Sequence, residues 1–231
     1  MTGPVRRPAY AISMRRVGAR AVAARMFAAG TVAAGAVVAG AFACVPHAAP
    51  LAGTRPAVTA SLPRVPLPPG PRRVTFRWRY DEQDGPSARG EGVARIMPPD
   101  TAQLQFFLAG GFGARTARLT GDRLELPDRD AFRRLVPAAP LLWAALGRLA
   151  LPPAADTVLR QAGDTLRGDV GRAPTWRVTL VGDSLRSVER IDGGRITERL
   201  DRAGDHVVYH HEVERRTLRI DILRDVPLAT P

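Results

Sequence analysis

The chain has 231 residues, of which 45% are apolar, enough to fill the core of one domain or of two small ones. Its formal net charge is +12, but six of the basic residues lie in the first 25 positions, and after Ala43 there are 28 Arg against 22 acidic residues. Since the two signs are interspersed and no basic stripe with interleaved aromatic residues occurs, the composition argues against a nucleic-acid partner.

The first 43 residues have the pattern of an export signal. An Arg-rich start leads into the uncharged run MFAAGTVAAGAVVAGAFA, from Met26 to Ala43. This run is short for a permanent membrane span, and the small residues at its end suit cleavage by a signal peptidase. We therefore predict a signal peptide over residues 1–43 and a place in the bacterial cell envelope.

Cys44 is the only cysteine and directly follows this run. Its position resembles that of a bacterial lipobox cysteine, which is acylated and becomes the mature N-terminus. We predict lipidation of Cys44, with plain secretion as the alternative; an internal disulfide is excluded because there is no second cysteine. Residues 44–72 are rich in Pro and Ala, which predicts an extended tether between the anchor and the folded domain, or a tail without a role.

The folded domain is expected over residues 73–226 and begins with strands. Val74, Phe76, Trp78 and Tyr80 alternate with polar residues, which is the period of a strand with one apolar face. Turn residues separate the remaining alternating segments. The further strands are expected at 87–97, 103–109, 115–120, 123–126, 166–170, 175–181, 185–191, 195–200, 206–213 and 217–223. The sequence thus predicts an antiparallel meander of about ten or eleven strands.

A helical insert, residues 128–150, separates the two sets of strands. Its apolar residues recur at offsets of three and four, and Asp128 suits the N-cap position. Pro137 and Pro140 cannot lie inside one unbroken helix, so a first helix should end near Val136 and a second should begin at Pro140.

The second helix is apolar on nearly every side, because only Arg148 is charged between Leu141 and Leu149. It is either a buried core helix or a lid over an apolar cavity. The insert is the only helical material that could cover the apolar face of the sheet. The expected fold is therefore mainly β: an incomplete antiparallel β-barrel, a half-barrel of about ten or eleven strands, covered by a short helical lid.

The order of these elements resembles that of the bacterial lipoprotein-localisation proteins LolA and LolB. The resemblance is one of pattern and covers about residues 73–223. In LolB-like chains a Trp-Arg strand is followed by a glycine-containing strand, a Pro-Asp turn, another strand, a hydrophobic residue beside glycine, and a strand that ends in G-x-x-L. The matching segments here are Trp78-Arg79, 90–96, Pro99-Asp100, 104–108, Phe112-Gly113 and 121–124, followed by an aromatic helix in LLWAALGRLALPPAADT.

The resemblance implies an apolar cavity for lipoprotein acyl chains and attachment to the outer membrane, facing the periplasm, through Cys44. The implied partners are lipid or lipoprotein acyl chains and outer-membrane lipid, with a periplasmic carrier protein left open. It also implies that Phe112 projects into solvent and passes the lipoprotein to the membrane. We expect the cavity walls to be Phe76, Trp78, Phe106, Leu108, Leu142, Trp143, Leu146, Trp176 and Leu180; a barrel filled by these same side chains is the alternative.

The sequence predicts no catalytic residue, no metal site and no cofactor. His210 and His211 would point to opposite faces of a strand, which we expect to be exposed, and so could not chelate one metal. Ser184 and Ser187 lie in no nucleophile elbow, and the glycines of residues 110–113 lie between two strands with no helix behind them. Two functions remain: a lipid- or lipoprotein-handling protein of the envelope, with a role in lipoprotein localisation, and an anchored scaffold with a filled barrel.

Overall fold

The computed structural model describes residues 45–229 except 54, 57–60, 111–112 and 128–129. Every described helix and strand belongs to one compact unit, Ala43–Pro231. The predicted signal peptide, Cys44, Asp128 and Phe112 lie outside the described residues.

In the described part of the chain, this unit is built on one antiparallel sheet of 13 strands, with two short helices. The strands are β1 (Arg55–Pro56), β2 (Arg72–Glu82), β3 (Ser87–Met97), β4 (Thr101–Leu108), β5 (Ala114–Thr120), β6 (Arg123–Glu125), β7 (Thr157–Ala162), β8 (Thr165–Val170), β9 (Thr175–Val181), β10 (Ser184–Asp192), β11 (Arg195–Ala203), β12 (His206–His211) and β13 (Arg216–Pro227). The helices are α1 (Asp130–Leu135) and α2 (Ala139–Ala145).

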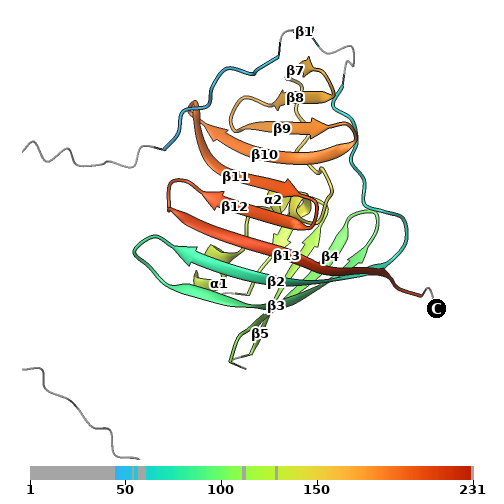
Figure 1. The fold of residues 1–231 in the computed structure, drawn as a ribbon, viewed down its shortest axis with the longest axis vertical. Helices are drawn as coiled ribbons and strands as arrows, with labels where there is room; N and C mark the ends of the chain where they lie inside the picture. Colours follow the sequence, from blue (N-terminus) through green and yellow to red (C-terminus); the bar gives the residue numbers. More distant parts are fainter. Residues whose placement is uncertain (1–44, 54, 57–60, 111–112, 128–129, 230–231) are drawn as a thin grey trace, which may run out of the picture. The chain divides into compact units, whose positions relative to one another are not determined.

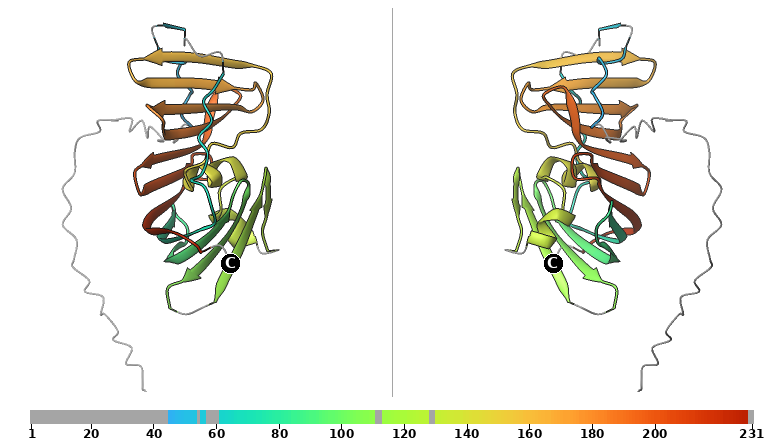
Figure 2. Two further views of the ribbon diagram at one scale, coloured as in Figure 1. Left: turned by 90° about the vertical axis from the view of Figure 1, so that its right-hand side faces the viewer. Right: turned by 90° about the vertical axis from the view of Figure 1, so that its left-hand side faces the viewer.

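The sheet is open. Its strand order is β1-β7-β8-β9-β10-β11-β12-β13-β2-β3-β4-β5-β6, so β1 and β6 are the two edges and do not pair with each other. The long pairing of β13 with β2 joins the two predicted sets of strands. The sheet curls around α1 and α2 (Figures 1 and 2). The predicted half-barrel with helical cover is thereby confirmed, with 13 strands in place of ten or eleven.

The two additional strands have no clear alternation in the sequence. β1 is only two residues long and falls within the predicted tether, where it pairs with β7. β7 lies near the edge of the sheet, and Leu159 is its only buried residue. Because little of β7 faces the core, its sequence lacks the period of two that marks the other strands.

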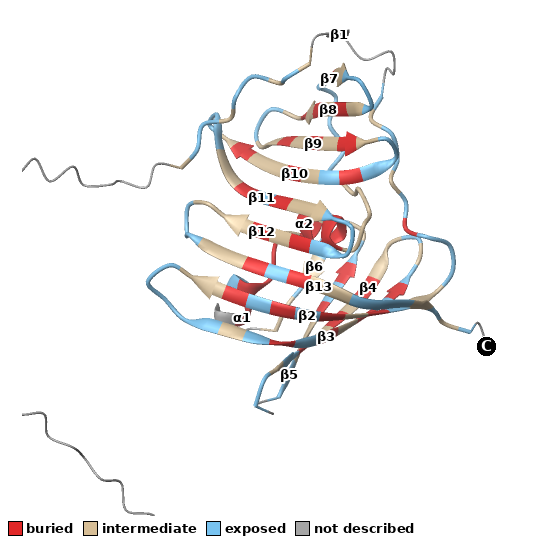
Figure 3. Ribbon diagram, in the orientation of Figure 1, coloured by how far each residue is buried: buried red, intermediate tan, exposed pale blue. Residues whose placement is uncertain are grey.

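The alternation of burial along the strands separates two faces of the sheet (Figure 3). Val74, Phe76, Trp78 and Tyr80 of β2 are buried, while Arg77 and Arg79 between them are exposed. We call the face that carries the buried residues and the helices the concave face, and the opposite one the convex face. Side chains at alternate positions of every long strand thus form one apolar layer.

Both helices form close to the positions that were predicted from Pro137 and Pro140. α1 ends at Leu135 and α2 begins at Ala139, but α2 stops at Ala145, five residues before the predicted end of the helical insert at residue 150. The reason is Gly147, whose φ of +92° terminates the helix. Neither helix in the described part of the chain has the length and apolar character needed to span a membrane.

Candidate functional site

The floor of the concave face is filled by aromatic rings. Phe106 on β4 lies edge-on to three other rings, with centroid distances of 5.5 Å to Phe76, 5.9 Å to Trp78 and 5.6 Å to Phe132 of α1. Edge-to-face contacts of this kind add to the stabilisation from buried area. The rings of β2 and β4 therefore pack on one another and on α1.

Helix α2 lies over this layer, and each of its residues except Pro140 is buried. Trp143 has no exposed surface, and its Nε1 donates a hydrogen bond to the Gly121 carbonyl, at 2.7 Å, in the turn between β5 and β6. The guanidinium of Arg148 lies 4.6 Å from the Trp143 ring centroid, a cation–π contact. The hydrogen bond to Gly121 attaches α2 to the β5–β6 end of the sheet, and the cation–π contact joins α2 to the segment that follows it.

A second contact attaches α2 to the other half of the sheet. Nη1 of Arg202, on β11, donates a hydrogen bond to the Ala145 carbonyl at 2.6 Å. The last carbonyls of a helix have no partner within the helix, so a cation there supplies one. Burial lowers the pKa of Arg202. Helix α2 thus connects β11 with the β5–β6 turn, two parts of the sheet that are not neighbours in the strand order.

The segment before β2 wraps around the β7 edge of the sheet. Its first part lies on the convex face, where the Ala48 amide donates to the Gly194 carbonyl at 2.9 Å and Nη1 of Arg177 donates to the Ala49 carbonyl at 2.6 Å. It then pairs with β7 through β1. The described residues of the predicted tether are therefore bound to the sheet.

The rest of this segment returns along the concave side; we call residues 61–71 the strap. Leu62 approaches Gly168 of β8 so closely that a Cβ there would lie 3.1 Å from a Leu62 methyl group. The Val65 carbonyl accepts a hydrogen bond from the Leu149 amide at 2.9 Å, and Leu67 is buried in the core. The strap thus covers the concave face beside α2.

A groove of about 740 Å³ runs between the strap and the segment that follows α2. The strap, the Pro98-Pro99 turn and residues 148–153 form its walls, and most of the lining is apolar. The side chains and backbone that line it are Arg64, Val65, Pro66, Leu67, Pro98, Pro99, Gly121, Asp122, Pro140, Arg148, Leu149, Ala150, Leu151, Pro152 and Pro153. Nη1 of Arg148 is buried at this groove and has no hydrogen-bond partner among the described residues.

A row of polar residues crosses the concave face at one end of the strands. Arg190, Glu198, His211, Arg216 and Glu82 lie opposite one another on β10, β11, β12, β13 and β2. The Glu198 carboxylate is buried and accepts hydrogen bonds from Nη1 of Arg190, at 3.0 Å, and from a tyrosine hydroxyl of β12, at 2.8 Å. We call this set the polar row.

Burial and charge at the polar row set the protonation of His211 and of two tyrosines beside the row. Burial, together with a hydrogen bond to Glu82, raises the pKa of the Tyr80 hydroxyl to about 12. Burial beside Glu198 raises the pKa of Tyr209 further. Burial, and secondarily the charge of Arg216, lowers the pKa of His211. Both phenols are thus protonated and His211 is neutral at neutral pH.

We expect stability to fall on acidification because of His211. Its pKa is lowered in the folded state, so the unfolded chain takes up this proton first as the pH falls below its ordinary pKa, near 6.5. The stability is complete above that pH and is lost as the pH falls through the lowered folded pKa. Thermal melts between pH 7.5 and pH 5 should show a smaller drop in Tm for His211→Gln than for the parent. Equal drops would show that His211 does not contribute.

Strand β12, which carries His210 and His211, was predicted to be exposed. In the structure it is instead central in the sheet, between β11 and β13. The signal that could have shown this is the buried pair Val207 and Tyr209 on the face of His211. Among the described residues, no three His, Cys, Asp or Glu side chains are grouped so that they could hold a metal.

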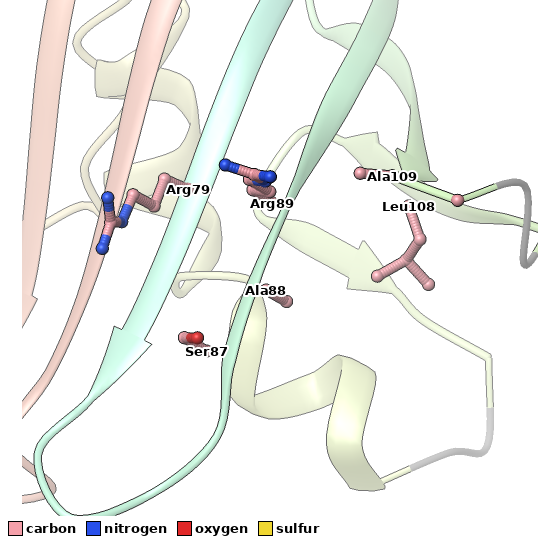
Figure 4. A pocket seen from close by; sticks show the side chains of 7 residues that line it. Arg79, Ser87, Ala88, Arg89, Leu108 and Ala109 are labelled. Carbon is pink, nitrogen blue, oxygen red and sulfur yellow. The ribbon is translucent and has the colours of Figure 1, made fainter. Parts of the chain in front are cut away.

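The residues predicted to wall a cavity fall into two groups. Seven are buried in the packed layer: Phe76, Trp78, Phe106, Leu142, Trp143, Trp176 and Leu180. Leu108 lines a surface pocket of about 570 Å³ with Arg79, Ser87 and Arg89 (Figure 4), and Leu146 lines one of about 480 Å³ beside Arg202. That any of these nine residues contacts an acyl chain stays a prediction. The strap and residues 149–153 were not among the predicted site residues, because neither segment has a periodic pattern.

No family model matches the sequence, and no curated protein matches it. Among solved structures, the chain is similar to a LolA superfamily protein from Nitrosomonas europaea, with 10% identity, a TM-score of 0.48, and coverage of 72% of this chain and 90% of that one. It is also similar to a putative outer membrane lipoprotein-sorting protein domain from Vibrio parahaemolyticus (8%, TM-score 0.43, 68% and 85%) and to a DUF1329 family protein from Desulfovibrio piger (9%, 0.42, 69% and 88%). The resemblance to the lipoprotein-localisation proteins is thus found again among solved structures, as a likeness of fold.

Proposed function

We propose that this protein binds an acyl chain of a lipid or lipoprotein in the groove beneath the strap. Its place would be the bacterial cell envelope, where an acylated Cys44 would anchor it to the outer membrane, facing the periplasm. The observation that supports this function is the groove itself, whose volume of about 740 Å³ lies within the range of ligand sites. Delivery of the acyl chain by a periplasmic carrier protein fits the same function.

The chemistry of the groove favours an acyl chain over a polar metabolite. Val65, Leu67, Leu149 and Leu151 offer apolar walls, and each methylene removed from water contributes ~0.8 kcal/mol. The unpartnered Nη1 of Arg148 could donate to the carboxylate or ester oxygen at the head of the chain. A ligand with one polar end and a long apolar body matches both features.

The open sheet allows such a ligand to enter. Because β1 and β6 do not pair, no ladder of hydrogen bonds closes the concave face. The strap and α2 are instead held by a few specific contacts, among them Leu149 to Val65, Trp143 to Gly121 and Arg202 to Ala145. Separation of the strap from residues 149–151 would expose the apolar layer without breaking strand pairs.

Leu149→Asp tests this function. The substitution places a carboxylate in the groove, so we expect the full chain in a nonionic detergent to bind a fluorescent fatty-acyl probe at least tenfold more weakly than the parent. The matched control is Val158→Asp, which makes the same kind of change at an exposed position of β7 and should leave probe affinity unchanged. Equal affinity of the Leu149 variant and the parent would show that the groove is not the acyl site.

A second function, an anchored scaffold that binds no lipid, is favoured by one observation. The aromatic rings of β2, β4 and α1 fill the floor of the concave face with their own contacts. Native mass spectrometry separates the two functions, since an acyl-binding protein purified from a bacterial envelope should retain lipid, and probe binding should displace it. A parent chain that carries no lipid and binds no probe would favour the scaffold. Neither function includes a catalytic step.

A further inference from the structure

Three arginines lie in one row on the convex face, away from the acyl groove. The register of the sheet places Arg73 of β2 opposite Arg95 of β3, Arg95 opposite Gln103 of β4, and Gln103 opposite Arg118 of β5. Adjacent strands are about 4.8 Å apart, so neighbouring side chains of the row are within reach of one another. We call these four residues the arginine row.

The arginine row lacks the acidic partners that other arginines of this face have. Arg79 and Arg219 both pair with Asp81, at 2.9 and 3.0 Å, and Arg177 pairs with Asp169 at 2.7 Å. By contrast, the three arginines of the row make no side-chain hydrogen bond or ion pair with any described residue. Like charges directly opposite each other on adjacent strands are destabilising. No acidic side chain offsets this repulsion in the arginine row, whereas Asp81 and Asp169 offset the charge of the other arginines just named.

The acidic groups near the arginine row do not neutralise it. Glu125 on the edge strand β6 lies opposite Arg118 in the register, but no ion pair joins them. Asp225 of β13 is already bound by Arg72, whose Nε donates to it at 2.7 Å. The positive charge of the row is therefore available to an external anion.

A pocket of about 410 Å³ lies over the arginine row. Its polar lining consists of hydrogen-bond donors: the three guanidinium groups, the Gln103 amide and the Thr101 hydroxyl, with no acidic residue. Met97, which is half exposed, and Leu228 complete the lining with apolar surface. Guanidinium groups present paired donors that match the oxygens of a phosphate, and several of them around one anion add geometric specificity.

We propose that the arginine row is a binding site for a phosphoryl anion. Arg95 and Gln103 lie at its centre and Arg73 and Arg118 flank them, so the phosphoryl oxygens can be shared among strands β2 to β5. The anion is either a free phosphate or the phosphate of a lipid headgroup, whose adjoining glycerol would contact Met97 and Leu228. The site is independent of the acyl groove, since no residue lines both.

Calorimetric titration of the full chain in a nonionic detergent tests the site. The probes are inorganic phosphate, the short-chain lipid dihexanoyl phosphatidylglycerol, and uncharged dihexanoylglycerol. We expect the parent to bind at least one phosphate-bearing probe and not the uncharged one, and Arg95→Gln to weaken that binding at least tenfold. Arg95→Lys should weaken it by less, since it keeps the charge but loses the paired donors. The matched control is Arg77→Gln, an exposed arginine of the same face outside the row, which should bind like the parent.

The outcomes separate the two sources of phosphate. Binding of inorganic phosphate alone assigns a free phosphate, and binding of phosphatidylglycerol alone or much more tightly assigns a lipid headgroup. Two results would overturn the site: a parent that binds neither phosphate-bearing probe, and equal weakening by Arg95→Gln and Arg77→Gln, which would indicate general surface charge. Because Arg95 is exposed and faces Arg73, its variants should have a Tm equal to that of the parent or slightly higher, and a melt of each variant confirms that folding is intact.

Discussion

Trp143→Ala should lower the free energy of unfolding by about 3–5 kcal/mol, the usual loss when a large aromatic side chain is removed from a packed core. The indole is fully buried in α2. Its removal also leaves the Gly121 carbonyl without its donor and takes away the ring on which Arg148 lies. Chemical denaturation of parent and variant, with the slope compared to check for two-state behaviour, gives the difference.

Trp143→Phe is the matched control for this change. It keeps an aromatic ring in the core but removes the hydrogen bond to Gly121 and part of the buried volume of the indole, so we expect a smaller loss, about 1–3 kcal/mol. The difference between the two variants measures the packing of α2. A loss below about 1 kcal/mol for Trp143→Ala would mean that α2 lies loosely on the sheet, as a detachable lid would.

The sequence of α2 left open whether it is a core helix or a lid, and its burial decides part of this question. A helix with a single charge between Leu141 and Leu149 needed cover on several faces, and the pattern could not separate a core helix from a lid. In the structure it is packed like a core helix, but two single hydrogen bonds, from Trp143 and Arg202, connect it to opposite halves of the sheet. The hydrogen bond from Arg202 could not be predicted from the sequence, because nothing distinguishes Arg202 from the other arginines of its strand.

The strands were predictable wherever one face is buried. Over β3, the expected bounds of 87–97 agree with the structure. The alternation of the strand is visible in the sequence, and the turn residues Asp84-Gly85-Pro86 directly precede it. β7 escaped prediction because it contacts the core through Leu159 alone. β1 and the strap escaped because their contacts are largely made by backbone groups, which any residue type can supply. β1 pairs with β7, and the Val65 and Pro71 carbonyls of the strap accept hydrogen bonds from Leu149 and Leu228.

The candidate site was predicted only in part for a related reason. The sequence identified the aromatic residues of the concave face, among them Phe76, Trp78 and Phe106, and these do form one layer. The sequence did not show that these side chains fill the concave face, because the depth of a cavity depends on the residues that lie beneath each ring. Beneath Phe76 and Trp78 lie two glycines of β3, Gly92 and Gly90.

Gly90→Ala should lower the free energy of unfolding by about 3 kcal/mol, at the upper end of the usual cost of overpacking. A Cβ at this position would lie 1.8 Å from the Phe107 carbonyl oxygen and 3.0 Å from the Trp78 ring. The first contact is with backbone, so relief requires β4 to move away from β3. Strand propensity alone predicts the opposite sign, because glycine weakens a strand relative to alanine. Thermal and chemical denaturation of parent and variant give both the sign and the size of the change in the free energy of unfolding.

The control for this change is Glu91→Ala, the neighbouring position on the convex face of β3. Glu91 is exposed, and only its backbone carbonyl, which accepts the Trp78 Nε1 hydrogen bond at 3.0 Å, takes part in the concave layer. We therefore expect a change within about 0.5 kcal/mol, as for most surface substitutions. If Gly90→Ala were as stable as the control, β3 and β4 would be free to separate locally. The same freedom would let the aromatic rings move apart, and the concave face could then open into a cavity.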